Sequence, residues 1–275
     1  MVLWALVGAI VAAGFLTGFT VGHLFVEDPS RTATQAIKRE LRRRPAFWRA
    51  RLDPAAATGL ALSIAVVCVV AFGAIAGVLA YMVRTNSGLV NGDRSIAAWA
   101  ATHVSAASTD SLRLITQLGA TATVVTLTII VAVIEYRRTP GRSVPSFLVL
   151  VLVGQALVVN LIKAIVDRAR PVVGPGGLFW GGSFPSGHSA AAAACYASFA
   201  LLSGRRRSPR ARAIIDGVAV AAAVAVACSR VLLRVHWFSD VLAGLAIGWG
   251  WFVLCSIAFG GRLLRFGAPV EEAKV

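Results

Sequence analysis

Apolar runs long enough to cross a lipid bilayer recur along almost the whole of this 275-residue chain. We predict seven helices from them, at about 3–25, 59–83, 112–134, 145–165, 186–203, 213–233 and 238–259. A helix of about 20 apolar residues spans the roughly 30 Å hydrocarbon core of a membrane. Only 14% of the residues are charged, against roughly 25% in soluble domains. The expected fold is therefore an all-α polytopic membrane helix bundle, with six core transmembrane helices and one extra N-terminal helix.

Three parts are expected along the chain. Residues 1–58 would hold an N-terminal transmembrane helix and a basic cytoplasmic segment, residues 59–260 the six-helix domain, and residues 261–275 a short cytoplasmic tail. The first apolar run has no basic residue before it and no clear cleavage site, which favours a retained helix over a signal peptide. The basic stretch Arg31–Arg51 is interpreted as a topology signal or as a helix lying on anionic headgroups.

The cysteines and the net charge exclude several classes of protein. Basic residues that flank membrane spans account for the formal charge of +15 better than nucleic-acid binding does, so no nucleic-acid partner is expected. The cysteines lie inside apolar runs without CxxC spacing, so neither a disulfide framework nor a zinc site is indicated. They are Cys68, Cys195, Cys228 and Cys255.

The distribution of basic residues predicts the orientation of the spans. Segments 27–58, 135–144, 204–212 and 261–275 hold 19 of the 27 Lys and Arg residues. Because cytoplasmic loops retain such residues, these alternate segments should be cytoplasmic, with anionic headgroups as their partners. A retained first helix would then place the N-terminus outside the cytoplasmic membrane and the C-terminus inside.

Three polar motifs lie at the predicted outward ends of the later helices. Residues 163–171 read K-x6-R-P, residues 185–188 read P-S-G-H, and residues 229–240 read S-R-x5-H-x3-D. In order and spacing they resemble the three-part signature of the type 2 phosphatidic acid phosphatase family, and the resemblance covers about residues 59–260. It implies a bundle of six membrane helices with a phosphatase site at their ends.

The third motif predicts a nucleophile. His236 and Asp240 are four residues apart, so they would share one face of a helix. A carboxylate there can fix the imidazole tautomer, which leaves the other ring nitrogen free to attack phosphorus. A phosphohistidine intermediate is the expected result.

The remaining motif residues supply positive charge and hydrogen-bond donors. Phosphoryl transfer depends on positioning and on cations around the equatorial oxygens. We expect His188 to act as general acid and later to activate water, in agreement with the role that the resemblance implies. The predicted phosphate-binding residues are Lys163, Arg170, Ser186, Gly187 and Arg230.

Neighbouring charges are assigned lesser roles. Arg168, Arg234 and Asp167 are expected at the rim of the site. No Gly-rich nucleotide loop, carboxylate metal cluster or H-E-x-x-H motif occurs, so no metal or other cofactor is predicted.

The expected function is hydrolysis of a lipid phosphate or diphosphate at the extracytoplasmic face. A polyprenyl diphosphate is favoured, with phosphatidic acid and phosphatidylglycerol phosphate close behind. Two alternatives stay open: a lipid phosphotransferase that uses the same histidine, and a transporter or scaffold that binds anionic lipid without catalysis. Multiple membrane spans argue against the family's haloperoxidase branch. The sequence does not determine the oligomeric state.

Overall fold

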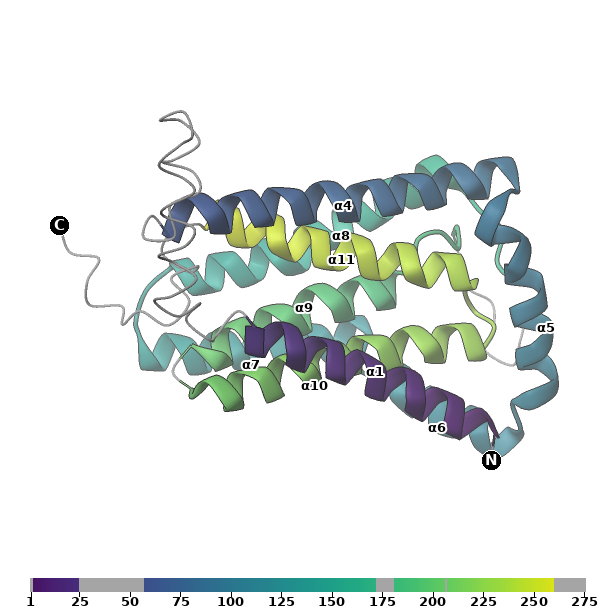
Figure 1. The fold of residues 1–275 in the computed structure, drawn as a ribbon, viewed down its shortest axis with the longest axis horizontal. Helices are drawn as coiled ribbons and strands as arrows, with labels where there is room; N and C mark the ends of the chain where they lie inside the picture. The colour runs from purple at the N-terminus through teal and green to yellow at the C-terminus, as the bar shows by residue number, and fades with distance from the viewer. Residues whose placement is uncertain (1, 25–56, 172–180, 206, 260–275) are drawn as a thin grey trace, which may run out of the picture.

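The computed structural model describes residues 2–24, 57–171, 181–205 and 207–259. The regular structure in these residues is helical, and the helices form an elongated bundle (Figure 1). The expectations for the basic stretch 31–51 and the tail 261–275 lie outside the described residues. The elements are α1 (Val2–Leu24), α4 (Ala57–Thr85), η1 (Gly88–Gly92), α5 (Asp93–His103), α6 (Ala106–Gln117), α7 (Thr121–Arg138), α8 (Ser143–Val166), α9 (Gly187–Gly204), α10 (Pro209–Leu232) and α11 (Phe238–Ala258).

Six helical segments in the described part of the chain are long and apolar enough to cross a membrane. They are Leu3–Thr20, Ala65–Thr85, Ala106–Arg138, Ser143–Val166, Pro209–Leu232 and Phe238–Ala258. α9 runs through the bundle with them, but it is packed against α7, α8, α10 and α11 and needs less apolar surface than a helix that faces lipid. Together these elements confirm the predicted bundle of six core helices and one N-terminal helix.

The central helix α9 packs closely against α11. Its Ala190–Ala194 run is buried, and Gly244 and Gly248 of α11 face it. A Cβ atom on Gly248 would lie 2.4 Å from the backbone oxygen of Ala190. Small residues on both helices therefore permit the short distance between their backbones, as is common between membrane helices.

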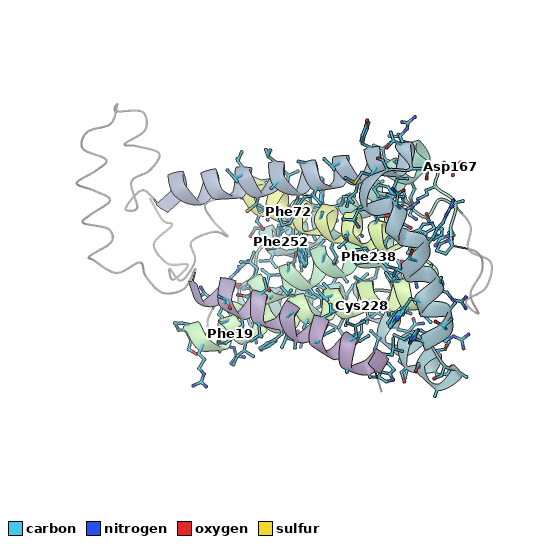
Figure 2. All side chains as sticks on the ribbon, turned by 45° about the vertical axis from the view of Figure 1, so that its right-hand side comes forward. Phe19, Phe72, Asp167, Cys228, Phe238 and Phe252 are labelled. Atoms are coloured by element: carbon cyan, nitrogen blue, oxygen red, sulfur yellow. The ribbon has the colours of Figure 1, made fainter. Side chains whose placement is uncertain are left out.

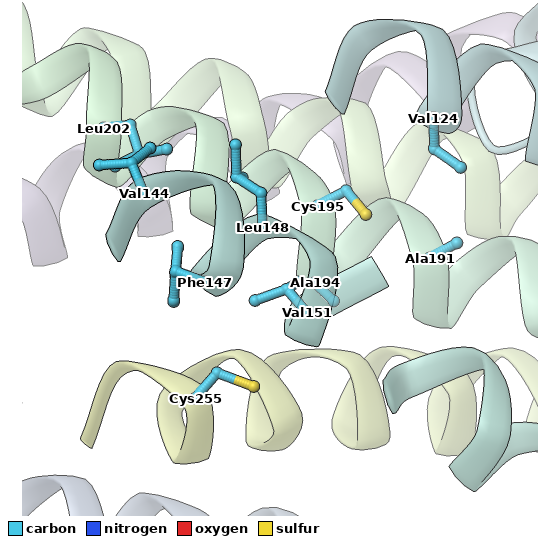
Figure 3. Close-up of a cluster of buried hydrophobic side chains, with 10 residues drawn as sticks. All are labelled: Val124, Val144, Phe147, Leu148, Val151, Ala191, Ala194, Cys195, Leu202 and Cys255. Atoms are coloured by element: carbon cyan, nitrogen blue, oxygen red, sulfur yellow. The ribbon is translucent and has the colours of Figure 1, made fainter. Parts of the chain in front are cut away.

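A cluster of buried apolar side chains joins α9 to α7, α8 and α11 (Figure 3). Phe147 and Val151 of α8 pack there with Cys195 of α9 and Cys255 of α11. Both thiols are free, and they fill space in this core as small apolar groups do.

The region between α4 and α7 differs from the expectation of one helix at 112–134. The structure has two helices there, and a turn at Leu118–Ala120 separates α6 from α7. Gly119 lies in this turn, where a Cβ atom would lie 3.2 Å from that of His188. Before it, η1 and α5 occupy a connection that the apolar pattern left as a loop, and α5 crosses the end of the bundle (Figure 1).

The N-terminal helix α1 packs along α10. Gly18 of α1 lies against the backbone of Asp216 and Gly217, and Gly217 in turn contacts Phe15. Leu3 and Val7 reach a cluster that contains Val235, next to the third motif. The beginning of α1 therefore lies at the same end of the bundle as α5 (Figure 1).

Candidate active site

The three motifs meet at one end of the bundle. The first motif follows the end of α8, the second begins α9, and the third connects the end of α10 to the beginning of α11. In Figure 2 the labels Asp167 and Phe238 mark this end, and Phe19 lies towards the opposite one. The up-and-down order of the helices thus brings segments far apart in the sequence to one place.

Hydrogen bonds to backbone carbonyls join the motif segments. The Ser186 amide donates to the Asp240 carbonyl at 2.9 Å, which links the second motif to the third. The Trp237 indole N–H donates to the Ala169 carbonyl at 2.8 Å, and the Ser183 amide donates to the Arg168 carbonyl at 2.7 Å. The relative positions of all three segments are therefore fixed by direct contacts.

The imidazole of His236 lies between the carboxylate of Asp240 and the guanidinium of Arg170. Its Nδ1 is 3.4 Å from Oδ2 of Asp240, a long contact, and it has no closer hydrogen-bond partner among the described residues. Its Nε2 lies 3.3 Å from Nη1 of Arg170. Since a guanidinium has only donors, Nε2 is the acceptor and Nδ1 carries the proton. The lone pair of a nucleophile would thus be on Nε2, on the side of the cation.

Burial keeps this imidazole neutral. Only 3% of the His236 side chain is exposed. Burial lowers the pKa of His236 from 6.5 to about 4, although the Asp240 carboxylate opposes this change. The ring therefore has a free lone pair at neutral pH.

Asp240 is held in one orientation by several donors. Its Oδ2 accepts from the Trp237 amide at 3.0 Å, at the first turn of α11. Its Oδ1 accepts from Nη1 of Arg168 at 2.7 Å. Both oxygens are used, so the carboxylate cannot rotate without loss of a hydrogen bond.

Arg170 and Arg230 interact electrostatically with the His236 imidazole, and Lys163 interacts in the same way with His188 beside it. Arg170 also donates to the Val235 carbonyl at 2.9 Å, and burial lowers its pKa while Asp240 opposes that change. Arg230 is buried and donates to Oγ1 of Thr116 at 3.1 Å. The ammonium group of Lys163 donates to the Gly182 carbonyl at 2.7 Å.

His188 belongs to the same group of side chains. The charged or titratable groups with which it interacts electrostatically are Arg230, His236, Lys163 and Arg170. It lies in the first turn of α9, where backbone amides have no partner within the helix and the helix dipole is positive. Gly187 is in the same turn, and the predicted contact of its amide with phosphate stays a prediction.

Ser186 caps α9. Its hydroxyl oxygen accepts from the Ser189 amide at 3.4 Å and from the Ser189 hydroxyl at 2.9 Å, and the side chain is fully buried. Its predicted contact with phosphate stays a prediction, because the observed contacts are those of a helix cap.

Arg168 corrects the expectation of a rim residue. Only 12% of its side chain is exposed, and its guanidinium bridges two buried carboxylates, Asp240 and Asp93. Asp93 begins α5, and its Oδ1 accepts from the Ser239 amide at 3.0 Å. Sequence reasoning missed Asp93 because it looked only at the three motifs. One signal could have pointed to it. Asp93 is an acidic residue, of which the chain has few, and it lies in a connection that was expected on the same side of the membrane as the motifs.

The two other expected rim residues have left-handed backbones. Asp167, with φ of 37°, ends α8 and is exposed, and Arg234, with φ of 54°, is partly exposed in the turn before His236. These positions fit the expectation of a place at the rim. Among the described residues there is no group of three or more His, Cys, Asp or Glu side chains able to hold a metal ion.

Comparison with known proteins identifies the family. Residues 145–263 match the model of the PAP2 superfamily. A lipid A 1-phosphatase of Rhizobium etli is 39% identical over 119 residues, which are 40% of this chain and 47% of that protein. A phosphatidylglycerophosphatase B of Bacillus subtilis is 32% identical over 157 residues, which are 55% of this chain and 75% of that protein.

A solved structure extends the likeness to the fold. The crystal structure of a transmembrane PAP2-type phosphatidylglycerolphosphate phosphatase from Bacillus subtilis superposes with a TM-score of 0.63 and 28% identity. The match covers 68% of this chain and 93% of the other. The chain is therefore a multi-pass membrane protein of the PAP2 superfamily, as the motif resemblance implied. It spans about half the length of the lipid A 1-phosphatases that it matches.

Proposed function

We propose that this chain is a membrane lipid phosphatase that works through a phosphohistidine on His236. One observation carries the proposal: Nε2 of His236 faces Arg170, while Nδ1 faces the fixed carboxylate of Asp240. A neutral imidazole with one oriented N–H and one lone pair beside a cation has the arrangement that a nucleophile for phosphorus needs. The names of the PAP2 relatives support the same activity.

In the first step, Nε2 of His236 forms a bond to phosphorus and the bond from phosphorus to the lipid oxygen breaks. For this step His188 must carry a proton on both ring nitrogens, a form that the negative charge of a bound phosphate favours. The leaving oxygen takes one of these protons, and the Asp240 carboxylate stabilises the positive ring of the phosphohistidine. Arg170 must turn from Nε2 towards the phosphoryl oxygens, where Arg230 and Lys163 add further positive charge.

In the second step, water attacks the phosphorus of the phosphohistidine. His188 accepts the proton of that water, the bond between phosphorus and nitrogen breaks, and its electron pair returns to Nε2. Inorganic phosphate leaves, and the enzyme regains its first state. The chain's own residues supply the nucleophile, the acid and the cations of this cycle, so we expect it to run without a metal ion.

The substrate would be a lipid whose phosphate reaches the end of the bundle while its tail stays in the membrane. A polyprenyl diphosphate, phosphatidic acid and phosphatidylglycerol phosphate are the candidates from sequence. The relatives' names support phosphatidylglycerol phosphate and add a lipid A 1-phosphate.

We further propose that the site faces the extracytoplasmic side of the cytoplasmic membrane. The ends of α7 and α9 and the beginnings of α8 and α10 lie opposite the site, and they carry exposed arginines such as Arg137, Arg142 and Arg207. Cytoplasmic ends of membrane helices are enriched in such residues.

A phosphate-release panel tests the activity. Purified wild-type protein would be assayed with the four lipids, with and without a chelator, beside His236→Ala and the control His103→Ala. His103 stacks on Trp99 at 4.4 Å between ring centroids and lies outside the motifs. We expect His236→Ala to lose at least about 10³-fold in kcat and the control to keep its activity.

The same panel separates the alternatives. Absence of phosphate release from every lipid, or normal turnover by His236→Ala, would overturn the proposal. Product formation that depends on a second lipid and yields no free phosphate would instead indicate a phosphotransferase.

A further inference from the structure

We propose that Arg168 is a positioning residue for the reaction, which holds the Asp240 carboxylate against His236 and is itself anchored by Asp93. This inference rests on the proposed function, because it assigns a task within the same site. It concerns two residues, Arg168 and Asp93, to which the motif analysis gave no part in the chemistry.

The contacts form a chain from the end of the bundle to the imidazole. Nη2 of Arg168 donates to Oδ2 of Asp93 at 2.7 Å. Nη1 of Arg168 donates at 2.7 Å both to Oδ1 of Asp240 and to Oγ of Ser239. Oδ2 of Asp240 then faces Nδ1 of His236. In this series of contacts Asp93 holds Arg168, Arg168 holds Asp240, and Asp240 faces His236.

The direction of the Asp240 carboxylate depends on this arrangement. Its two oxygens have different tasks, since Oδ1 meets Arg168 and Oδ2 meets His236. Without Arg168, one strong charge-assisted hydrogen bond would be lost and the carboxylate could turn. The long contact of 3.4 Å to Nδ1 makes the imidazole sensitive to such a rotation.

Asp93 keeps the guanidinium in place. It lies on α5, far from the motifs in sequence, and its side chain is 1% exposed. It also accepts hydrogen bonds from the amide and the hydroxyl of Ser239, so it fixes the first turn of α11 as well. The helix that crosses the end of the bundle therefore contributes directly to the geometry of the nucleophile.

The surroundings of Arg168 argue against a direct role in binding phosphate. Both terminal nitrogens already donate to Asp93, Ser239 or Asp240. The guanidinium also lies over the Trp237 ring, 5.3 Å from its centroid. A group held on both nitrogens and packed on an aromatic ring is suited to fix its neighbours rather than to follow a substrate.

The charge balance points the same way. Asp93 and Asp240 are both buried, and the guanidinium between them offsets one of their two negative charges. Removal of the cation would leave two buried carboxylates near each other, which is strongly unfavourable. We therefore choose test variants that keep a positive charge or remove a negative one.

The test compares Arg168→Lys, Asp93→Asn and the double variant with the controls Arg94→Lys and Asp110→Asn. Arg94 and Asp110 are exposed residues at the same end of the bundle. Each protein is assayed for kcat, KM, inhibition by inorganic phosphate and melting temperature. An ammonium group cannot donate to both carboxylates with the geometry of a guanidinium. Arg168→Lys should therefore disturb the contacts with Asp93 and Asp240 while it keeps the positive charge.

We expect kcat to fall by about 10- to 100-fold in both single variants. Losses of this size are usual when a residue that orients a functional group, without touching the substrate, is replaced. KM and phosphate inhibition should stay at their wild-type values. The kcat of the double variant should be no lower than that of the less active single variant, because both residues act through Asp240. One further variant, Arg168→Ala, removes the cation and is made for chemical rescue alone. Added guanidinium ion can occupy the space between Asp93 and Asp240, so it should restore part of the activity of this variant.

Other results would overturn the inference. Unchanged kcat in both single variants would do so, as would a change confined to KM and phosphate inhibition, which would make Arg168 a phosphate ligand. A loss of kcat that follows the melting temperature, without rescue by guanidinium, would show a merely structural role. Absence of phosphate release by the wild-type protein would instead remove the proposed function, and this inference with it.

Discussion

Arginine lies at both ends of this bundle, but in two different environments. At the site end, Arg230 is buried against Thr116, and Arg168 bridges Asp93 and Asp240. At the opposite end, arginines such as Arg137 and Arg142 are exposed, and Arg138, paired with Glu135 at 2.9 Å, is half exposed. Exposed ion pairs contribute little to stability, whereas loss of a partner from a buried pair is costly. The same residue type is therefore held by buried partners at one end and left exposed at the other, which is the contrast on which the proposed site and the proposed orientation depend.

The largest effect should come from Asp240→Asn. The amide keeps an oxygen acceptor but loses the charge that orients the Nδ1–H of His236, so kcat should fall by about 10³- to 10⁴-fold. Phosphate release and melting temperature would be measured beside Asp110→Asn, whose carboxylate is 76% exposed. A loss of less than tenfold would mean that the site does not need a fixed imidazole.

Gly244→Ala should have the next largest effect. Its Cβ atom would lie 2.5 Å from the Ser186 carbonyl oxygen, so α9 and α11 would have to separate and move the second motif away from the third. A shift of about 1 Å can cost about 10²-fold in rate. Gly77→Ala is the matched control, because its Cβ atom would meet nothing within 4 Å. Equal kcat and melting temperature in both variants would contradict the close packing.

The buried imidazole should make stability depend on pH. The pKa of His236 is about 4 in the folded protein, below its ordinary 6.5, so between these values the unfolded chain binds a proton that the folded chain does not. Stability should therefore fall as the pH drops from about 6.5 to about 4, with a melting temperature lower by a few degrees. Thermal unfolding of the wild type and of His236→Gln measures this contribution. The same pH dependence in both proteins would show that His236 is not buried as described.

The smallest effect is expected at the opposite end. Arg142→Gln and Arg207→Gln should each change stability by no more than about 0.5 kcal/mol and leave kcat unchanged, because both side chains are exposed and far from the site. Phosphate-release assays on the purified variants check this. A large loss of kcat in either variant would remove the distinction between the two ends.

The sequence predicted the spans and the motifs well, for a physical reason. Apolar runs of membrane length are a local signal, and six of the seven expected helices begin and end within a few residues of the observed ones, the exception being the helix expected at 112–134. Lys163, Arg170 and His236 lie near helix ends, so the alternation of the spans was enough to bring them to one side.

The contacts of Arg168 with Asp93, and the course of the chain between α4 and α7, could not be predicted, because they depend on residues far apart in the sequence. Arg168 bonds to Asp93 over a sequence separation of 75 residues, and Ser239 bonds to Asp93 over a separation of 146 residues. α5 is a helix that lies across the bundle end, so it lacks the long apolar run by which the spans were recognised. The break at Gly119 was missed because apolar residues continue on both sides of it.

The central claim is that an imidazole at the end of this bundle takes the phosphoryl group. The most direct measurement is a rapid quench of purified protein with a radiolabelled lipid phosphate, followed by peptide mapping of the label. The account predicts an acid-labile, alkali-stable phosphate on the peptide that contains His236, which appears and decays at the rate of turnover. Label on another residue, or turnover with no labelled protein at any time, would contradict it.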